Sequence, residues 1–216
     1  MAYFPIFIEI EKQKCLVIGG GKVALRKIET LLRYGAQVQV ISREVCEEIS
    51  GLLSPECIRL GEPEEADMSG AVLVIAATGS RQVNHRAAVY CRENGIPVNV
   101  ADAPEECSFF FPAVVKKGDI SVGINTGGKS PSVSSQVRRD IEKAVPDYYG
   151  DIAEQLGRLR EYVKSHVEPE YDRRAILKQA AAAAFRQERT LSQNEINTMI
   201  RQVLNHGTVS GGPVGY

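Results

Sequence analysis

The stretch Cys15-Leu-Val-Ile-Gly-Gly-Gly-Lys-Val-Ala24 decides the fold of this chain. Its first four residues are apolar and predict a buried strand, and three glycines follow at once. From Lys22 to Tyr34 the apolar residues recur at helical spacing, and Gly35 supplies a stop signal. A strand, a glycine turn and a helix in this order predict a phosphate-binding turn in an α/β protein.

The spacing Gly19-x-Gly21-x-x-Ala24 gives each small residue a physical role. Gly19 permits a tight turn, Gly21 lets the backbone approach a pyrophosphate, and Ala24 lets the helix pack closely on the strand. The N-terminus of the helix then offers free N–H groups and a partial positive charge. The alternative is a tight turn in an α/β protein that binds no cofactor.

Strands and helices continue to alternate through the first half of the chain. We expect strands at 38–41, 57–60, 71–77 and 98–101, and helices at 45–53 and 82–94. The segment 71–77 is apolar and β-branched, which is typical of a strand covered on both faces. This alternation predicts an α/β fold with a Rossmann-like, doubly wound parallel sheet.

The sequence changes character after about residue 112. One more strand is expected at 119–125, then a helix at 132–144, and three further helices at 152–167, 171–186 and 193–205. We therefore divide the chain into a dinucleotide-binding domain (1–112), a central segment (113–146), a helical domain (147–206) and a flexible tail (207–216).

The start of the last helix can be predicted from its capping residues. Ser192 and Glu195 have the spacing of a capping box, with Leu191 and Ile196 as its hydrophobic staple.

A second motif lies before the helix expected at 132–144. The segment 123–130 matches the phosphate-loop pattern G-x-x-x-x-G-K-[ST].

We do not expect this match to be a phosphate loop that hydrolyses nucleotides. Pro131 biases Ser130 away from helical angles, so Ser130 is better placed as the N-cap of a helix that begins at Pro131. Gly123 also falls inside the expected strand rather than after it. The alternative is a flexible anion-binding loop formed by glycine amides and Lys129.

The choice of dinucleotide is open at the end of the second strand. An NAD site usually has an acid there, about 20 residues after the glycine turn, that binds the ribose hydroxyls. This chain has Ile41-Ser42-Arg43 instead, with Glu44 next. Arg43 could suit a 2′-phosphate, whereas Ser42 or Glu44 could reach a ribose.

Composition excludes several classes of protein. The 216 residues carry 26 Lys and Arg against 27 Asp and Glu, so there is no general positive charge to gather nucleic acid. No apolar run approaches the roughly 20 residues of a membrane helix, and the N-terminus lacks a basic secretion signal. The five cysteines form no C-x-x-C pair and the three histidines lie far apart, so we expect a reduced, cytoplasmic protein without a metal site.

Asp102 is the candidate catalytic residue. It follows the strand 98–101, and ligands of open parallel sheets bind beyond the carboxyl ends of the strands. A carboxylate there could take a proton, bind a cationic nitrogen or touch a metal. The alternative is that Asp102 only caps the turn at Pro104–Glu106. The segment 116–143 has six basic and three acidic side chains, which would suit a polyanionic ligand or form a solvated helix face.

Several ordered motifs together resemble the precorrin-2 dehydrogenases, which are also found as the N-terminal part of siroheme synthases. The resemblance covers nearly the full length and is strongest over residues 4–145. The segments that carry it are Phe4-Pro-Ile-Phe7, Leu16–Ala24 with Arg26 and Lys27, Ala76-Ala-Thr78 with Asn84, Asn99–Pro104, Ser108–Ala113 and Thr126–Pro131.

The resemblance implies NAD-dependent oxidation of precorrin-2 to sirohydrochlorin by a homodimer whose dimerisation region begins near residue 113. It places the dinucleotide at Gly19, Gly21, Lys22 and Val23, with its adenosine ribose near Ser42 and Arg43. Asp102 matches the family's catalytic aspartate, and Ser130 matches a serine that can be phosphorylated in some siroheme synthases. Because the substrate carries eight carboxylates, Lys129, Ser130, Arg138 and Arg139 become candidate substrate contacts.

Two other functions stay open at this stage. Some members of the family also insert Fe²⁺ into sirohydrochlorin, and Asp102 could then accept the pyrrole protons. A non-catalytic redox sensor would need only the dinucleotide-binding fold. Asp102, the loop 126–131 and the helical second half favour an enzyme over a sensor.

Overall fold

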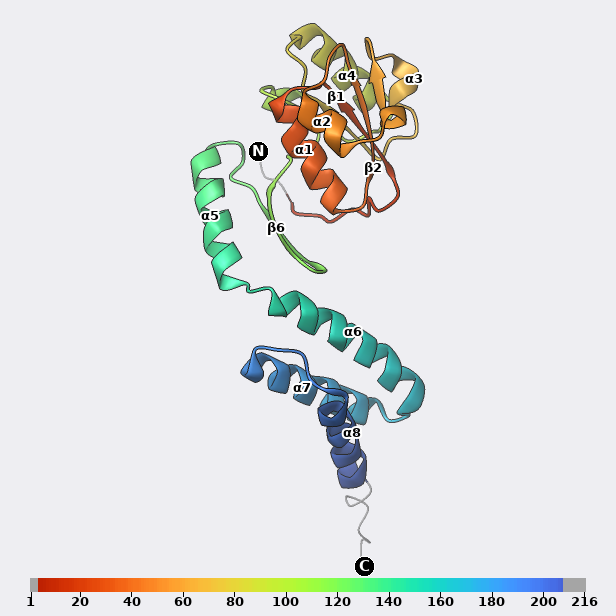
Figure 1. Ribbon diagram of the computed structural model, residues 1–216, viewed down its shortest axis with the longest axis vertical. Helices are drawn as coiled ribbons and strands as arrows, with labels where there is room; N and C mark the ends of the chain where they lie inside the picture. The colour runs from red at the N-terminus through yellow and green to blue at the C-terminus, as the bar shows by residue number, and fades with distance from the viewer. Residues whose placement is uncertain (1–3, 208–216) are drawn as a thin grey trace, which may run out of the picture. The chain divides into compact units, whose positions relative to one another are not determined.

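A computed structural model of the protein describes residues 4–207 and divides the chain into two compact units (Figure 1). The first unit contains the chain up to Pro112 together with Gly127–Lys129. The second contains Ala113–Thr126 and the chain from Ser130 onward. Each unit has a hydrophobic core of its own.

The first unit contains the predicted parallel sheet. Its strand order is β3-β2-β1-β4-β5, and all four pairings are parallel. The strands are β1 (Lys14–Ile18), β2 (Gln37–Ser42), β3 (Ile58–Leu60), β4 (Leu73–Ala76) and β5 (Val98–Val100). The α/β, Rossmann-like class is therefore confirmed.

Helices cover both faces of this sheet because β1 and β4 are apolar on both sides. Cys15 and Val17 of β1 pack with helices α1 and α2, whereas Leu16 and Ile18 pack with α3 and α4. These helices are α1 (Lys22–Arg33), α2 (Glu47–Leu52), α3 (Glu65–Met68) and α4 (Arg81–Glu93); short 3₁₀ turns lie at Pro55–Cys57 and Pro104–Glu106.

The chain changes the direction in which it adds strands to the sheet between β1 and β4. From β1 the chain moves outward to β2 and β3, and it then returns to form β4 and β5 on the other side. The loops that leave the carboxyl ends of β1 and β4 therefore diverge and leave a crevice between them. This switch point positions the candidate site.

The second unit begins with an antiparallel hairpin of β6 (Ala113–Lys117) and β7 (Ile120–Ile124). The sequence predicted β7 but missed β6, a short segment that follows Pro112 and ends in two lysines. The hairpin is a separate sheet and does not extend the parallel one. Helix α5 (Pro131–Ala144) follows and packs on the hairpin.

Three helices complete the second unit: α6 (Tyr148–His166), α7 (Glu170–Gln187) and α8 (Gln193–Gly207), which share one core (Figure 1). The capping box before α8 is confirmed, because the Ser192 N–H donates to Glu195 Oε2 over 2.7 Å and the Glu195 N–H donates to Ser192 Oγ over 3.4 Å. The expected tail beyond Gly207 lies outside the described residues. Within 4–207, no helix combines the length and apolarity needed to cross a membrane.

Candidate functional site

The glycine turn after β1 is shaped by its lack of side chains. Gly19 has a φ of +124°, and a Cβ on it would lie 2.7 Å from the carbonyl carbon of Ala77. A Cβ on Gly20 would lie 2.7 Å from Cα of Val45. Gly21, the N-cap of α1, has no atom within 4 Å of such a position. The turn therefore packs tightly against its neighbours and leaves open space in front of the helix.

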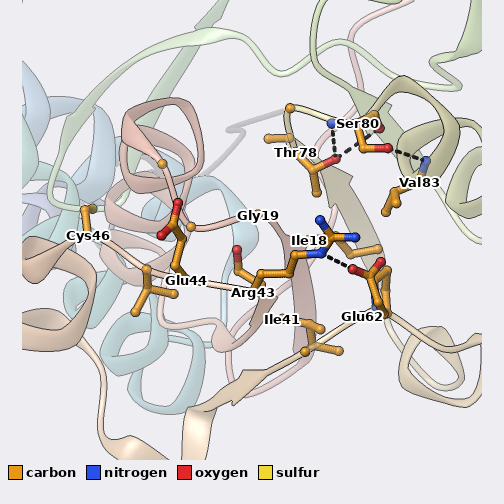
Figure 2. Close-up of a pocket in the computed structure, with 18 residues that line it drawn as sticks. Ile18, Gly19, Ile41, Arg43, Glu44, Cys46, Glu62, Thr78, Ser80 and Val83 are labelled. Carbon is orange, nitrogen blue, oxygen red and sulfur yellow. Dashed lines mark hydrogen bonds and ion pairs between the residues drawn. The ribbon is translucent and has the colours of Figure 1, made fainter.

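A pocket of about 770 Å³ lies beyond this turn, at the carboxyl ends of β1, β2 and β4 (Figure 2). Its volume is within the range of small-molecule and cofactor sites. The first turn of α1 adds the free N–H groups and partial positive charge that favour a pyrophosphate. The lining residues fall in four short segments, 18–21, 41–46, 61–63 and 77–80, together with Val83.

The pocket wall next to the glycine turn is held by a network around Thr78. The Thr78 hydroxyl donates to Asn84 Oδ1 over 2.7 Å, and the Thr78 N–H donates to the same oxygen over 3.1 Å. The Asn84 amide returns a bond to the Thr78 carbonyl over 3.1 Å. Asn84 is buried, so these bonds satisfy its polar atoms and fix the loop between β4 and α4.

Four of the six predicted dinucleotide contacts meet at this pocket. Gly19, Gly21, Ser42 and Arg43 line it. The other two, Lys22 and Val23, form the first turn of α1 but do not line the pocket. Their assignment as cofactor contacts stays a prediction.

The pocket also contains a carboxylate that the sequence pattern did not reveal. The Gly61 N–H donates to the Ser42 carbonyl over 2.9 Å, which places the loop after β3 beside the end of β2. Glu62 follows Gly61 and forms an ion pair with Arg43, and Figure 2 shows the two side chains directed toward each other. The only signal in the sequence was that Glu62 closely follows β3, the strand that pairs with β2. Spacing rules that count residues from the glycine turn do not consider this strand.

Asp102 follows β5 at the same edge of the sheet, with a φ of +58°. Non-glycine residues seldom adopt this left-handed conformation, and such residues cluster at functional sites. The 3₁₀ turn at Pro104–Glu106 has Ala103 at its N-cap and no capping side chain, so Asp102 does not cap it. Asp102 is exposed and does not line the pocket.

Lys27 of α1 lies near Asp102 and was not predicted as a site residue. Its Nζ donates to Asn99 Oδ1 over 2.9 Å and lies 4.4 Å from the ring centroid of Phe111. Burial lowers the pKa of Lys27, and the nearby Cys107 and Asp102 partly oppose this shift. The lysine therefore links the helix of the glycine turn to β5, the strand that precedes Asp102.

The candidate substrate contacts lie in two different places. Lys129 belongs to the first unit, whereas Ser130, Arg138 and Arg139 belong to the second. Ser130 caps α5 by accepting a bond from the Val133 N–H over 3.3 Å.

This cap explains why the phosphate-loop match does not form a phosphate loop. The helix begins at Pro131, after Lys129 and Ser130, and Gly123 lies within β7, as the sequence indicated.

The two candidate arginines of α5 have partners on their own helix. Arg138 pairs with Glu142 at 2.6 Å, and Arg139 donates to Gln136 over 2.6 Å. These contacts leave the role of both arginines in substrate binding a prediction. Among residues 4–207, no group of three or more His, Cys, Asp or Glu side chains is placed to hold a metal.

Comparisons with known proteins agree with this geometry. Residues 6–113 match the family described as "Putative NAD(P)-binding", and the chain belongs to that family. It is 41% identical over 169 residues to a siroheme synthase of Methylococcus capsulatus (77% of this chain, 36% of the relative). It is 38% identical over 177 residues to one of Nitrosomonas europaea (81% and 37%). The chain therefore matches little more than a third of the length of these curated relatives.

A solved structure named "SirC, precorrin-2 dehydrogenase" has the same fold. It superposes with a TM-score of 0.71 and 21% identity, covering 94% of this chain and 100% of that one. The predicted resemblance to siroheme synthases is thus confirmed over the part of those relatives that the chain matches, and the match to the solved structure confirms the fold. A nicotinamide dinucleotide is the cofactor that the family match supports.

Proposed function

We propose that the protein is an NAD-dependent dehydrogenase that oxidises precorrin-2 to sirohydrochlorin. The observation that carries this proposal is the placement of a glycine-turn pocket and of Asp102 at the same carboxyl edge of one parallel sheet. The siroheme synthase relatives point to the same substrate class.

The residues present fit a dinucleotide. The space in front of Gly21 can accept a pyrophosphate against the N-terminus of α1, and Ser42 and Arg43 stand where an adenosine ribose would lie. When bound, the nicotinamide supplies the hydride acceptor. Lys22 and Val23 are proposed as additional contacts from the first turn of α1.

The reaction removes one hydride and one proton from precorrin-2. Asp102 is exposed at the strand end, and we assign it the role of the base that accepts the proton. Lys27 lies close enough to act on Asp102 through its charge. We assign Lys129, Ser130, Arg138 and Arg139 to the carboxylates of the substrate, since charge-assisted hydrogen bonds are the strongest available to them.

An anaerobic incubation with precorrin-2 and NAD, followed by absorption spectra, tests this proposal. We expect the spectrum of sirohydrochlorin to appear in step with NADH. Ferrous iron added afterwards tests the second activity, in which Asp102 would accept the two displaced pyrrole protons one after the other, releasing the first to solvent before it takes the second. Siroheme that forms faster than in a protein-free control supports the bifunctional enzyme. Dinucleotide binding without any oxidation would favour the non-catalytic sensor.

We further propose that the protein is a cytoplasmic homodimer whose interface includes α5. No residue of this helix is buried, although Val133 and Val137 lie four positions apart on one face and are 51% and 36% exposed. A second copy of the chain would cover this apolar strip. All five cysteines are free, which agrees with a reducing compartment.

A further inference from the structure

The end of β2 alone would make the pocket suited to NADP. Ser42 and Arg43 stand where a dinucleotide-binding protein usually has an acid, and an arginine at this point accommodates a 2′-phosphate. A guanidinium also binds phosphate in a bidentate manner, more specifically than a lysine does. Considered without its neighbours, Arg43 therefore predicts a preference for the phosphorylated cofactor.

The loop after β3 changes this chemistry. Gly61 is bonded to the Ser42 carbonyl, and Arg59 Nη2 donates to the Glu62 carbonyl over 3.0 Å. Arg59 is itself paired with Asp67, so its charge is already compensated. These two hydrogen bonds hold Glu62 beside the end of β2 although Glu62 is distant from it in sequence.

Glu62 is placed to act on a ligand as well as on Arg43. Its carboxylate accepts a hydrogen bond from Arg43 Nε, and both residues line the pocket (Figure 2). The Arg43 side chain is 81% exposed and the Glu62 side chain 46% exposed. An ion pair this exposed contributes little to folding stability, so its main effect is on the charge that a ligand meets.

We propose that Glu62 is the residue that makes this pocket select NAD over NADP. Its carboxylate neutralises Arg43, accepts hydrogen bonds from the ribose hydroxyls of NAD, and repels a 2′-phosphate. The acid expected at the end of β2 is thus supplied from the end of β3. This inference rests on the proposed function, because it assumes that the pocket binds a nicotinamide dinucleotide.

Calorimetric titration of the purified chain with NAD and with NADP, at low ionic strength, tests the proposal. We expect the unchanged protein to bind NAD more tightly. Glu62→Gln should lower the ratio of the NADP to the NAD dissociation constant by about tenfold or more, because a repulsion is removed and Arg43 is released. Adding Arg43→Ala to Glu62→Gln should reduce the gain in NADP affinity, because the released guanidinium would no longer be present to bind the 2′-phosphate. Thermal unfolding of Glu62→Gln should match that of the unchanged protein.

Glu65→Gln is the matched control, since Glu65 is an exposed acid close in sequence that does not line the pocket. It should leave the ratio unchanged. The inference is overturned if Glu62→Gln leaves the ratio unchanged, if Glu65→Gln lowers it equally, or if the loss of Arg43 does not diminish the gain in NADP affinity. An unchanged protein that binds neither dinucleotide would overturn the proposed function as well, whereas tight NAD binding with an unaltered ratio would remove this inference alone.

Discussion

Asp102 holds a left-handed backbone conformation at the end of β5, and its exposed carboxylate is free of any capping role. Strain of this kind persists only where the surrounding structure enforces it, and here it directs the chain away from the sheet at the point where ligands bind. Asparagine tolerates the same conformation, so it removes the charge without disturbing the backbone.

Asp102→Asn should therefore lower the turnover of precorrin-2 by about a hundredfold or more, as the loss of a general base does. The NAD dissociation constant should not change. Steady-state rates and a binding titration on the same preparation measure both quantities. Asp119→Asn is a suitable control, because Asp119 is exposed in the turn between β6 and β7. Full activity in the Asp102 variant would remove Asp102 from the reaction.

Gly21 allows the cofactor site to be tested separately from the fold. Its backbone is extended, and a side chain there would meet no atom within 4 Å. Gly21→Leu should change the free energy of unfolding by only about 1 kcal/mol, the usual cost at an N-cap. Its side chain would fill the space assigned to the pyrophosphate, so the NAD dissociation constant should rise by about tenfold or more.

Gly51→Leu is the control for Gly21→Leu, because Gly51 is equally open but does not line the pocket. Unfolding in urea and NAD titration distinguish the two effects. Equal NAD affinity in the Gly21 variant and the unchanged protein would mean that the cofactor does not lie on the glycine turn.

At the scale of helices and strands, patterns local in sequence were the most predictable features. The apolar runs of β1 and β4, the periodicity of α1 and the N-cap of α5 each follow from a few consecutive residues. The hairpin strand β6 was missed because its stability comes from pairing with β7, which no local pattern contains. Glu62 was missed for a similar reason, since its place beside Arg43 depends on the pairing of β2 with β3.

The capping box of α8 predicts a pH dependence of stability. Arg189, and then the backbone and side chain of Ser192, lower the pKa of Glu195 to about 2 from an ordinary value of 4.5. A depressed carboxylate pKa stabilises the folded state above the unfolded pKa, and this contribution is lost as the pH falls toward the folded value. The stabilisation by Glu195 should thus be complete above about pH 4.5 and disappear toward pH 2.

Glu195→Gln should lower the urea midpoint of the protein at pH 7, and the difference from the unchanged protein should shrink steadily below pH 4.5. Glu161→Gln, an exposed position within α6, should show no such trend. A difference that stays constant down to pH 3 would show that the charge of Glu195 does not stabilise the helix start.

For the molecule as a whole, we predict a dimer because α5 has no buried residue and exposes an apolar strip. Replacing Val133 and Val137 together with aspartate should give a monomer in light scattering, because two charges would enter an apolar contact. Helix content by circular dichroism should be retained. Ser135→Asp, an exposed position on the same helix, should leave the mass of a dimer. A monomeric unchanged protein would contradict the proposed assembly.

The most direct test of the proposed activity is the amount of NADH formed when the unchanged protein receives NAD and precorrin-2 without oxygen. One hydride leaves the substrate for each sirohydrochlorin produced, so we predict that one NADH forms per product molecule. The fluorescence of NADH measures the amount formed. Tight NAD binding at the glycine turn, with no NADH formed even after prolonged incubation, would contradict the assignment of this protein as a dehydrogenase.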